Sequence, residues 1–318
     1  MAETKTILAV AVGPQKDRTI SDENSLGDVR PYIRGLIAGL TKFGHRIGAD
    51  YVITYRERED VSSANAGAFT VNGGSQGGLV IFGMSTTVVQ AAAAQTEGIP
   101  ILGVVSDPQA EGIDKWVHVC GVSGRRSQTA GDCCERFLDT VPSLKEIRAL
   151  HKPGYGPSER SLALVKAAAA KRGVNVRAVP VGSRQDIERA LSAMPARELS
   201  TPPEIGVQVL PVDVCLGAAP LIIDLAQERK KVPVFFPIPD WVKPALPSAL
   251  GAYGIAQHKC GELSAACVDD ILWKGQHPTS MHAHLRFRES PDDSLVWVVS
   301  KAAARALNID LGSKVPVI

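Results

Sequence analysis

No unbroken apolar run in the chain approaches about 20 residues, the length that a helix needs to cross a bilayer. Neither sign of charge dominates, since 35 Lys and Arg residues face 33 Asp and Glu residues, for a formal net charge of +2. The chain also has no basic tract or low-complexity arm of the kind that binds nucleic acid. We therefore expect a soluble protein with no nucleic-acid partner.

Signatures of catalysis and metal binding are missing as well. The six cysteines have no C-x-x-C spacing and mostly stand among apolar neighbours, which favours buried thiols over a zinc site or disulfides. His282 and His284 lack a third ligand, and no Gly-x-Ser-x-Gly elbow joins a predicted strand to a helix. A cysteine-based racemase or a serine hydrolase is the leading enzyme alternative, but the cysteines fall mostly within predicted helices and not at strand ends. The sequence predicts no enzyme activity, cofactor or metal.

Length and residue pattern both predict two domains. At 318 residues, the chain exceeds the size at which one apolar core usually stops growing. Short β-branched runs alternate with longer helical patterns, which is typical of parallel sheets covered on both faces. The alternation starts at the predicted strand Ile7–Val12 and begins afresh after Gly121. The predicted fold class is α/β, with two Rossmann-like lobes.

The remaining elements follow the same alternation. Strands are expected at 51–55, 79–82, 101–105, 116–120, 147–151, 176–181, 205–210 and 232–236. Helices are expected at 30–43, from Ser85 or Thr86 onward, and at 128–138, 159–171 and 258–273. A last strand at 295–299 and a helix at 301–307 cannot bury their apolar faces alone. The chain must therefore cross between the lobes more than once.

Several strings resemble one family. They are FGMSTTVVQAAAAQTEGIPILGVVSDP at 82–108, CGVSG at 120–124, VLPVD at 209–213 and KAAARALNIDLGSKVP at 301–316. In order and spacing they resemble the substrate-binding proteins of ABC importers, of the tryptophan- and phenylalanine-binding type, which have the type I periplasmic-binding fold. The resemblance extends over nearly the whole chain.

The resemblance implies two lobes joined by a three-strand hinge, with ligand held in the cleft at the carboxyl ends of both sheets. The first lobe would hold residues 1–121 and 250–280, and the second 122–249 and 281–318. Hinges are expected near 121–123, 249–251 and 280–282. The implied protein is a periplasmic monomer that closes over a small amino acid or organic acid and delivers it to an ABC permease.

Six cysteines and the absence of a recognisable signal peptide in the sequence are unusual for an exported member of that family. They favour an alternative, a cytoplasmic ligand sensor of the same fold. A signal peptide in the native precursor would favour the substrate-binding protein of an importer over the cytoplasmic sensor.

Candidate binding residues in the first lobe follow its predicted strands. Ser85 and Thr86 begin a helix whose free N–H groups and positive dipole end suit a ligand carboxylate. The structural alternative is that one of these side chains caps the helix and binds no ligand. Ser106 and Asp107 follow the next strand, where Asp107 before proline can instead form an Asx turn. Gln15 holds the matching position after the first strand.

The second lobe offers an acid and three aromatic rings. Asp213 follows a strand and suits the ammonium group of an amino acid, with a helix N-cap as its structural alternative. Phe236 and Trp241 could sandwich an apolar ligand or pack the hinge. Tyr155, in the loop after the first strand of this lobe, completes the candidate set.

Overall fold

A computed structural model describes residues 4–12, 15–27, 29–58, 61, 67–70, 78–281 and 286–318. The chain divides into two compact units. Unit 1 consists of Met1–Arg125 and Gln257–Ser290, and unit 2 consists of Arg126–Ala256 and Pro291–Ile318. The chain therefore passes from one unit to the other three times. The two histidines 282 and 284 lie outside the described residues.

Unit 1 is built on a seven-stranded sheet in the order β12-β6-β5-β4-β1-β3-β2. All neighbouring strands are parallel except β2, which pairs antiparallel with β3. The strands are β1 (Lys5–Val12), β2 (Lys16–Ile20), β3 (Tyr51–Arg58), β4 (Leu79–Gly83), β5 (Ile101–Val105), β6 (Val119–Ser123) and β12 (Phe287–Glu289). Because β4, β5 and β6 are buried along their whole length, they carry the continuous apolar runs of a sheet covered on both faces.

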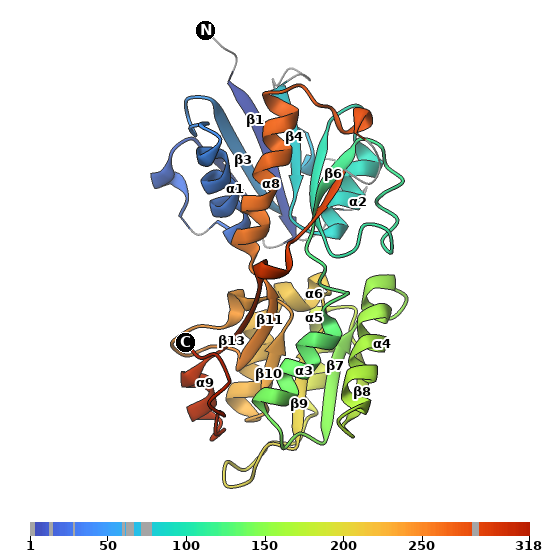
Figure 1. The fold of residues 1–318 in the computed structure, drawn as a ribbon, viewed down its shortest axis with the longest axis vertical. Coiled ribbons are helices and arrows are strands. Elements are labelled where there is room, and N and C mark those ends of the chain that lie inside the picture. The colour runs from blue at the N-terminus through green and yellow to red at the C-terminus, as the bar shows by residue number, and fades with distance from the viewer. Residues whose placement is uncertain are drawn as a thin grey trace. The chain divides into compact units, whose positions relative to one another are not determined.

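The helices of unit 1 are α1 (Pro31–Lys42), α2 (Thr86–Gln95) and α8 (Gln257–Leu272). α1 and α8 pack against each other over the sheet (Figure 1). Their contact is close because glycines face backbone: a Cβ on Gly35 would lie 1.8 Å from the carbonyl oxygen of His258, and one on Gly261 would lie 2.0 Å from that of Tyr32. α2 shares a separate apolar cluster with Leu8 and Ile81.

Unit 2 is built on a six-stranded sheet in the order β13-β11-β10-β9-β7-β8, in which only β13 is antiparallel. Its strands are β7 (Glu146–His151), β8 (Asn175–Pro180), β9 (Ile205–Val209), β10 (Val234–Phe236), β11 (Gly251–Ile255) and β13 (Leu295–Val299). Its helices are α3 (Ala130–Thr140), α4 (Gly156–Ala170), α5 (Arg184–Ser192), α6 (Asp213–Gly217), α7 (Ala219–Ile222) and α9 (Lys301–Ala306), with a π-helical turn at Ile223–Arg229. The core of this unit includes a stacked pair of rings, Phe137 and Phe235, with centroids 4.9 Å apart.

The unit boundaries differ from the lobes expected from the sequence. The second and third crossovers fall at 256/257 and 290/291, whereas the sequence placed them near 250 and 281. The reason is strand pairing. β11 pairs with β10 and β13, which keeps residues 251–255 in unit 2, while β12 pairs with β6, which keeps residues 287–289 in unit 1.

Two further differences are local. The strand expected at 116–120 begins three residues later, as β6, because residues 113–119 form turns in which Trp116 and Val119 donate backbone hydrogen bonds to the carbonyls of Ile113 and Trp116. β2 was not expected as a strand. The six cysteines are all free and buried, which confirms their prediction as small apolar core residues.

Candidate ligand-binding site

The carboxyl edge of the first sheet brings together three candidate segments. β5, β4 and β1 are adjacent and parallel, and they end at Val105, Gly83 and Val12. The residues that follow them are therefore grouped at one edge. These residues are Ser106 and Asp107, Ser85 and Thr86, and Gln15. Gln15 is exposed, whereas Thr86, Ser106 and Asp107 are buried.

Ser85 and Thr86 begin α2, as expected, but their side chains are already engaged. Ser85 is the N-cap, with extended backbone, and its hydroxyl accepts a hydrogen bond from the amide of Val88 at 3.4 Å. Thr86 donates from Oγ1 to Oε1 of Glu111 at 2.8 Å. The start of α2 therefore already has a carboxylate beside it, that of Glu111.

Glu111 also bonds to the segment after β5. Its Oε2 accepts from the amide of Asp107 at 3.3 Å, and its own amide donates to the carbonyl of Asp107 at 3.0 Å. Asp107 accepts from the amide of Ala110, three residues on, at 3.1 Å, so its side chain caps the turn that follows and does not form the Asx turn considered as its alternative, which bonds two residues on. Glu111 was not singled out in the sequence, although an acid four residues after an Asp-Pro turn was the available signal. It links the ends of β4 and β5.

A partly buried ion pair lies at the same edge, where β1 and β3 end. Arg30, which immediately precedes α1, donates from Nε to Oε1 of Glu57 at 2.7 Å and from Nη2 to the carbonyl of Val12 at 2.8 Å. The hydroxyl of Tyr55 donates to the same oxygen of Glu57 at 2.6 Å. Burial and this bond to Glu57 raise the pKa of Tyr55 well above its ordinary value. The sequence did not point to this group, because its members are far apart along the chain.

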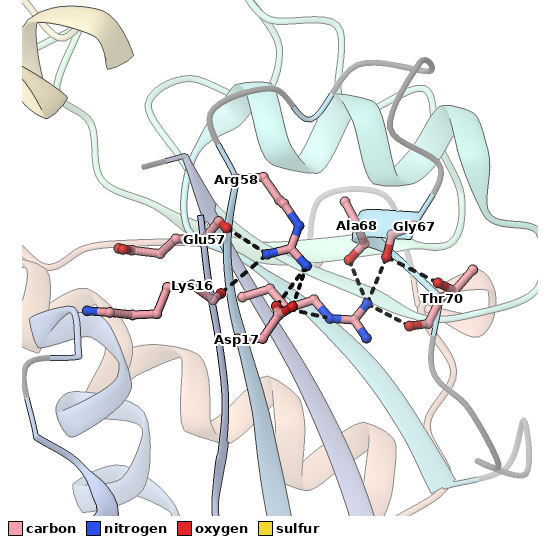
Figure 2. Close-up of polar contacts among 8 residues, drawn as sticks. Lys16, Asp17, Glu57, Arg58, Gly67, Ala68 and Thr70 are labelled. Carbon is pink, nitrogen blue, oxygen red and sulfur yellow. Dashed lines mark hydrogen bonds and ion pairs between the residues drawn. The ribbon is translucent and has the colours of Figure 1, made fainter. Parts of the chain in front are cut away.

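Two other arginines near this edge hold the sheet together. Figure 2 shows Arg58 donating to Asp17 and to the carbonyls of Lys16 and Glu57. Arg56 lies 3.7 Å from the Asp17 carboxylate and donates to the carbonyls of residues 67, 68 and 70 at 3.0, 3.1 and 2.6 Å. These contacts attach β2 and the 67–70 segment to β3. Both side chains therefore form hydrogen bonds within unit 1.

The carboxyl edge of the second sheet groups the other candidates. β10, β9 and β7 are adjacent and parallel. Asp213 is the first residue of α6. It is not the N-cap considered as its structural alternative, because that position is occupied by Val212. Its Oδ2 is buried and has no hydrogen-bond partner among the residues that the structure describes. A buried acceptor without a partner is costly, and a ligand donor would remove that cost.

Two ring nitrogens near this edge are buried polar atoms like Oδ2 of Asp213. Nε1 of Trp241 and Nδ1 of His151, the last residue of β7, are buried without a hydrogen-bond partner in the described parts of the chain. The Trp241 ring lies 6.4 Å from that of Phe236, centroid to centroid, and Phe236 itself is fully buried. His151 was not named as a candidate, although a polar residue at the end of a buried strand is the signal that pointed to the others.

Tyr155 lies at the start of α4, after β7. Its backbone is extended at the N-cap position, and its side chain makes no cap hydrogen bond. The ammonium group of Lys152 lies 5.9 Å from the centroid of the Tyr155 ring. This arrangement places an aromatic face and a cation beside the end of β7.

The described residues contain no group of three or more His, Cys, Asp and Glu side chains that could hold a metal ion. Among the helices in the described ranges, none is long and apolar enough to span a membrane.

Comparisons with known proteins agree with the architecture. The profile of the family described as ABC transporter substrate binding protein matches residues 28–317. No curated protein matches the chain in sequence. Many solved structures also match the chain, and several resemble it over nearly its full length.

A conserved domain protein from Vibrio cholerae is 21% identical, with a TM-score of 0.72 over 98% of this chain and 97% of the other. An ABC domain from Streptococcus pneumonia in complex with L-Trp is 20% identical, with a TM-score of 0.71 over 98% of this chain and 100% of the other. A substrate binding protein with adhesive properties from Clostridium difficile, in a ligand-free open structure, is 21% identical, with a TM-score of 0.56 over 99% of both chains. These likenesses confirm the predicted type I periplasmic-binding fold with two mostly parallel sheets.

Proposed function

The chain belongs to the ABC transporter substrate binding protein family, and on this basis we propose that it binds a carboxylate-bearing amino acid and presents it to a membrane permease. The preferred ligand is an aromatic amino acid, with other organic acids as the next class. The protein performs no chemistry on the ligand. Its place of action is the periplasm, where the proteins of this kind meet their permeases.

One observation carries the proposal: the two carboxyl edges offer complementary chemistry. The start of α2 supplies N–H groups, the positive end of a helix dipole and the hydroxyl of Ser85 for a carboxylate. Oδ2 of Asp213, buried without a partner among the residues that the structure describes, supplies an acceptor for an ammonium group. Trp241 offers an aromatic face and an indole N–H. A ligand that engaged both edges would place its carboxylate at α2, its ammonium group at Asp213 and a flat side chain at Trp241, and the L-Trp found in the Streptococcus structure has these three groups.

Binding is coupled to a change of conformation in this proposal. A ligand that engages residues of both units stabilises the form in which both can reach it. The rotation would be absorbed where the chain changes unit, at 125/126, 256/257 and 290/291. Arg125, at the first of these points, has a φ of 49°, which a non-glycine residue rarely adopts.

A thermal-shift screen of the standard amino acids, aromatic acids, neutral sugars and organic cations tests the ligand class. A ligand at about 100 times its Kd stabilises the native state by about 2.7 kcal/mol, which raises the melting temperature by several degrees. We expect phenylalanine or tryptophan to raise it most. If only neutral sugars or cations raised it, the proposed ligand class would be wrong.

Glu111 provides a test of where the ligand carboxylate lies. Its carboxylate is bonded to Thr86 beside the start of α2, so it should repel a second carboxylate placed there. We expect Glu111→Gln to tighten the binding of an amino acid by about fivefold, equivalent to about 1 kcal/mol. Titration calorimetry measures the change. The matched control is Glu97→Gln, in the exposed turn after the other end of α2, which should leave affinity unchanged. Weaker binding in Glu111→Gln would instead make Glu111 a partner of the ligand ammonium.

A further inference from the structure

A large cavity lies within unit 2 at the edge of the sheet opposite to Asp213 and Trp241. It has a volume of about 920 Å³, and its walls come from the connections that enter β7, β8, β9 and β10. Figure 1 shows the loop that enters β9 at this edge. The volume lies within the range of about 300–1,000 Å³ that small-molecule pockets have. None of the binding residues considered above lines this cavity, so it would be a second, separate site.

The walls of the cavity are mainly apolar. The side chains that form them include Leu144, Val174, Pro202, Ile205 and Val232. The hydroxyl of Ser143, which also lines the cavity, already donates to the carbonyl of Pro203 at 2.7 Å. The body of any ligand held here must therefore be apolar.

Three cationic side chains line the cavity, and two of them have carboxylate partners. Nζ of Lys145 lies 2.6 Å from Oε1 of Glu204, and Nη1 of Arg172 lies 3.1 Å from Oδ1 of Asp139. The third, Arg197, is bound differently.

Within the described parts of the chain, Arg197 donates hydrogen bonds to carbonyl oxygens alone. It donates from Nε to Thr201 at 3.0 Å, from Nη1 to Lys231 at 3.3 Å and from Nη2 to Leu307 at 2.5 Å. No carboxylate of the described residues forms an ion pair with it. Burial lowers the pKa of its guanidinium, because the charged form is desolvated. A guanidinium has five N–H donors, so two remain for a ligand.

We propose that this cavity binds an amphiphilic organic anion with a single head group, such as a medium-chain carboxylate. The apolar chain occupies the space between Leu144, Val174 and Ile205, and the head group pairs with Arg197. The negative head group of the anion pairs with the positive charge of Arg197, which has no carboxylate partner among the described residues. Such a ligand differs in place and in chemistry from the amino acid proposed for the carboxyl edges.

Titration calorimetry with decanoate tests the proposal, with decyltrimethylammonium as the probe of opposite charge. We expect decanoate to bind with a stoichiometry of one and the cation not to bind. In ¹H–¹⁵N correlation spectra, decanoate should shift the amide signals of residues 142–145 and 195–205. Arg197→Gln should weaken decanoate binding about tenfold or more, because a charge-assisted hydrogen bond is lost.

Since Arg197 also ties three carbonyls together, a second variant leaves it in place. Val174→Trp fills the cavity and should abolish decanoate binding, whereas Val296→Trp, the same substitution at a 43% exposed position of β13, should leave it intact. Equal binding of decanoate and the cation would overturn the proposal. So would full decanoate binding by Val174→Trp, or the absence of saturable binding by the unaltered protein.

Discussion

Replacing Asp213 by asparagine is expected to weaken the binding of an amino acid about 100-fold, because a charge-assisted hydrogen bond is worth about 1.5–3 kcal/mol. The reason is that Oδ2 of Asp213 is buried without a partner in the described residues, so it is available to a ligand ammonium group. Asparagine has nearly the same shape, and the Asp213 side chain does not cap α6. The melting temperature without ligand should therefore change little. Titration calorimetry measures the loss of affinity.

A matched pair of ligands separates the ammonium contact from a general loss of binding. Phenylalanine and 3-phenylpropionate share a ring and a carboxylate, but only phenylalanine has an ammonium group. Asp213→Asn should weaken phenylalanine and leave 3-phenylpropionate unchanged or slightly tighter. An equal effect on both ligands, or on neither, would remove Asp213 from its proposed role.

The substitution Gly121→Ala should destabilise the chain by about 3 kcal/mol or more, through overpacking and backbone strain. Gly121 lies in β6 opposite Gly103 of β5. It has a φ of 154°, and a Cβ there would lie 1.9 Å from the carbonyl oxygen and 2.7 Å from the amide nitrogen of Gly103. Both contacts are with backbone, so no side-chain rotation can relieve them. The pairing of β5 with β6 would have to separate locally.

Urea unfolding of Gly121→Ala and of Gly98→Ala distinguishes the clash from the cost of the backbone angle alone. Gly98 has a φ of 72°, but a Cβ there meets no atom of the described residues within 4 Å. We expect Gly98→Ala to cost about 1 kcal/mol, the usual penalty for a left-handed residue with a side chain. If the two variants were equally stable, the close approach of β5 and β6 would not be the reason for glycine at 121.

The architecture could be predicted from the sequence because its signals are local. Alternating β-branched runs and amphipathic segments specify parallel sheets, and in parallel sheets the residues after neighbouring strands share an edge. That rule grouped Ser85, Thr86 and Ser106 in one unit and Asp213 with Trp241 in the other. The first residues of α2 were also predictable, because Ser85 has the side chain of an N-cap.

What escaped prediction depends on contacts between distant segments. The ion pair of Arg30 with Glu57 joins residues 27 positions apart. The unit boundaries shifted because the short strands β11 and β12 are placed by their partners β10 and β6, not by a pattern of their own. The engagement of Thr86 by Glu111 likewise depends on a turn that folds back across 25 positions. The acid four residues after the Asp-Pro turn can be seen in the sequence, but its pairing with Thr86 cannot.

The central claim is that one ligand engages the carboxyl edges of both units. A titration followed by ¹H–¹⁵N correlation spectra tests it most directly, because Trp241 is one of only four tryptophans and its indole N–H gives a separate signal. With the amino acid selected by the thermal-shift screen, the indole signal of Trp241 and the amide signals of Ser85 and Ser106 should shift along one 1:1 binding curve. Shifts confined to one unit at full saturation would contradict the account.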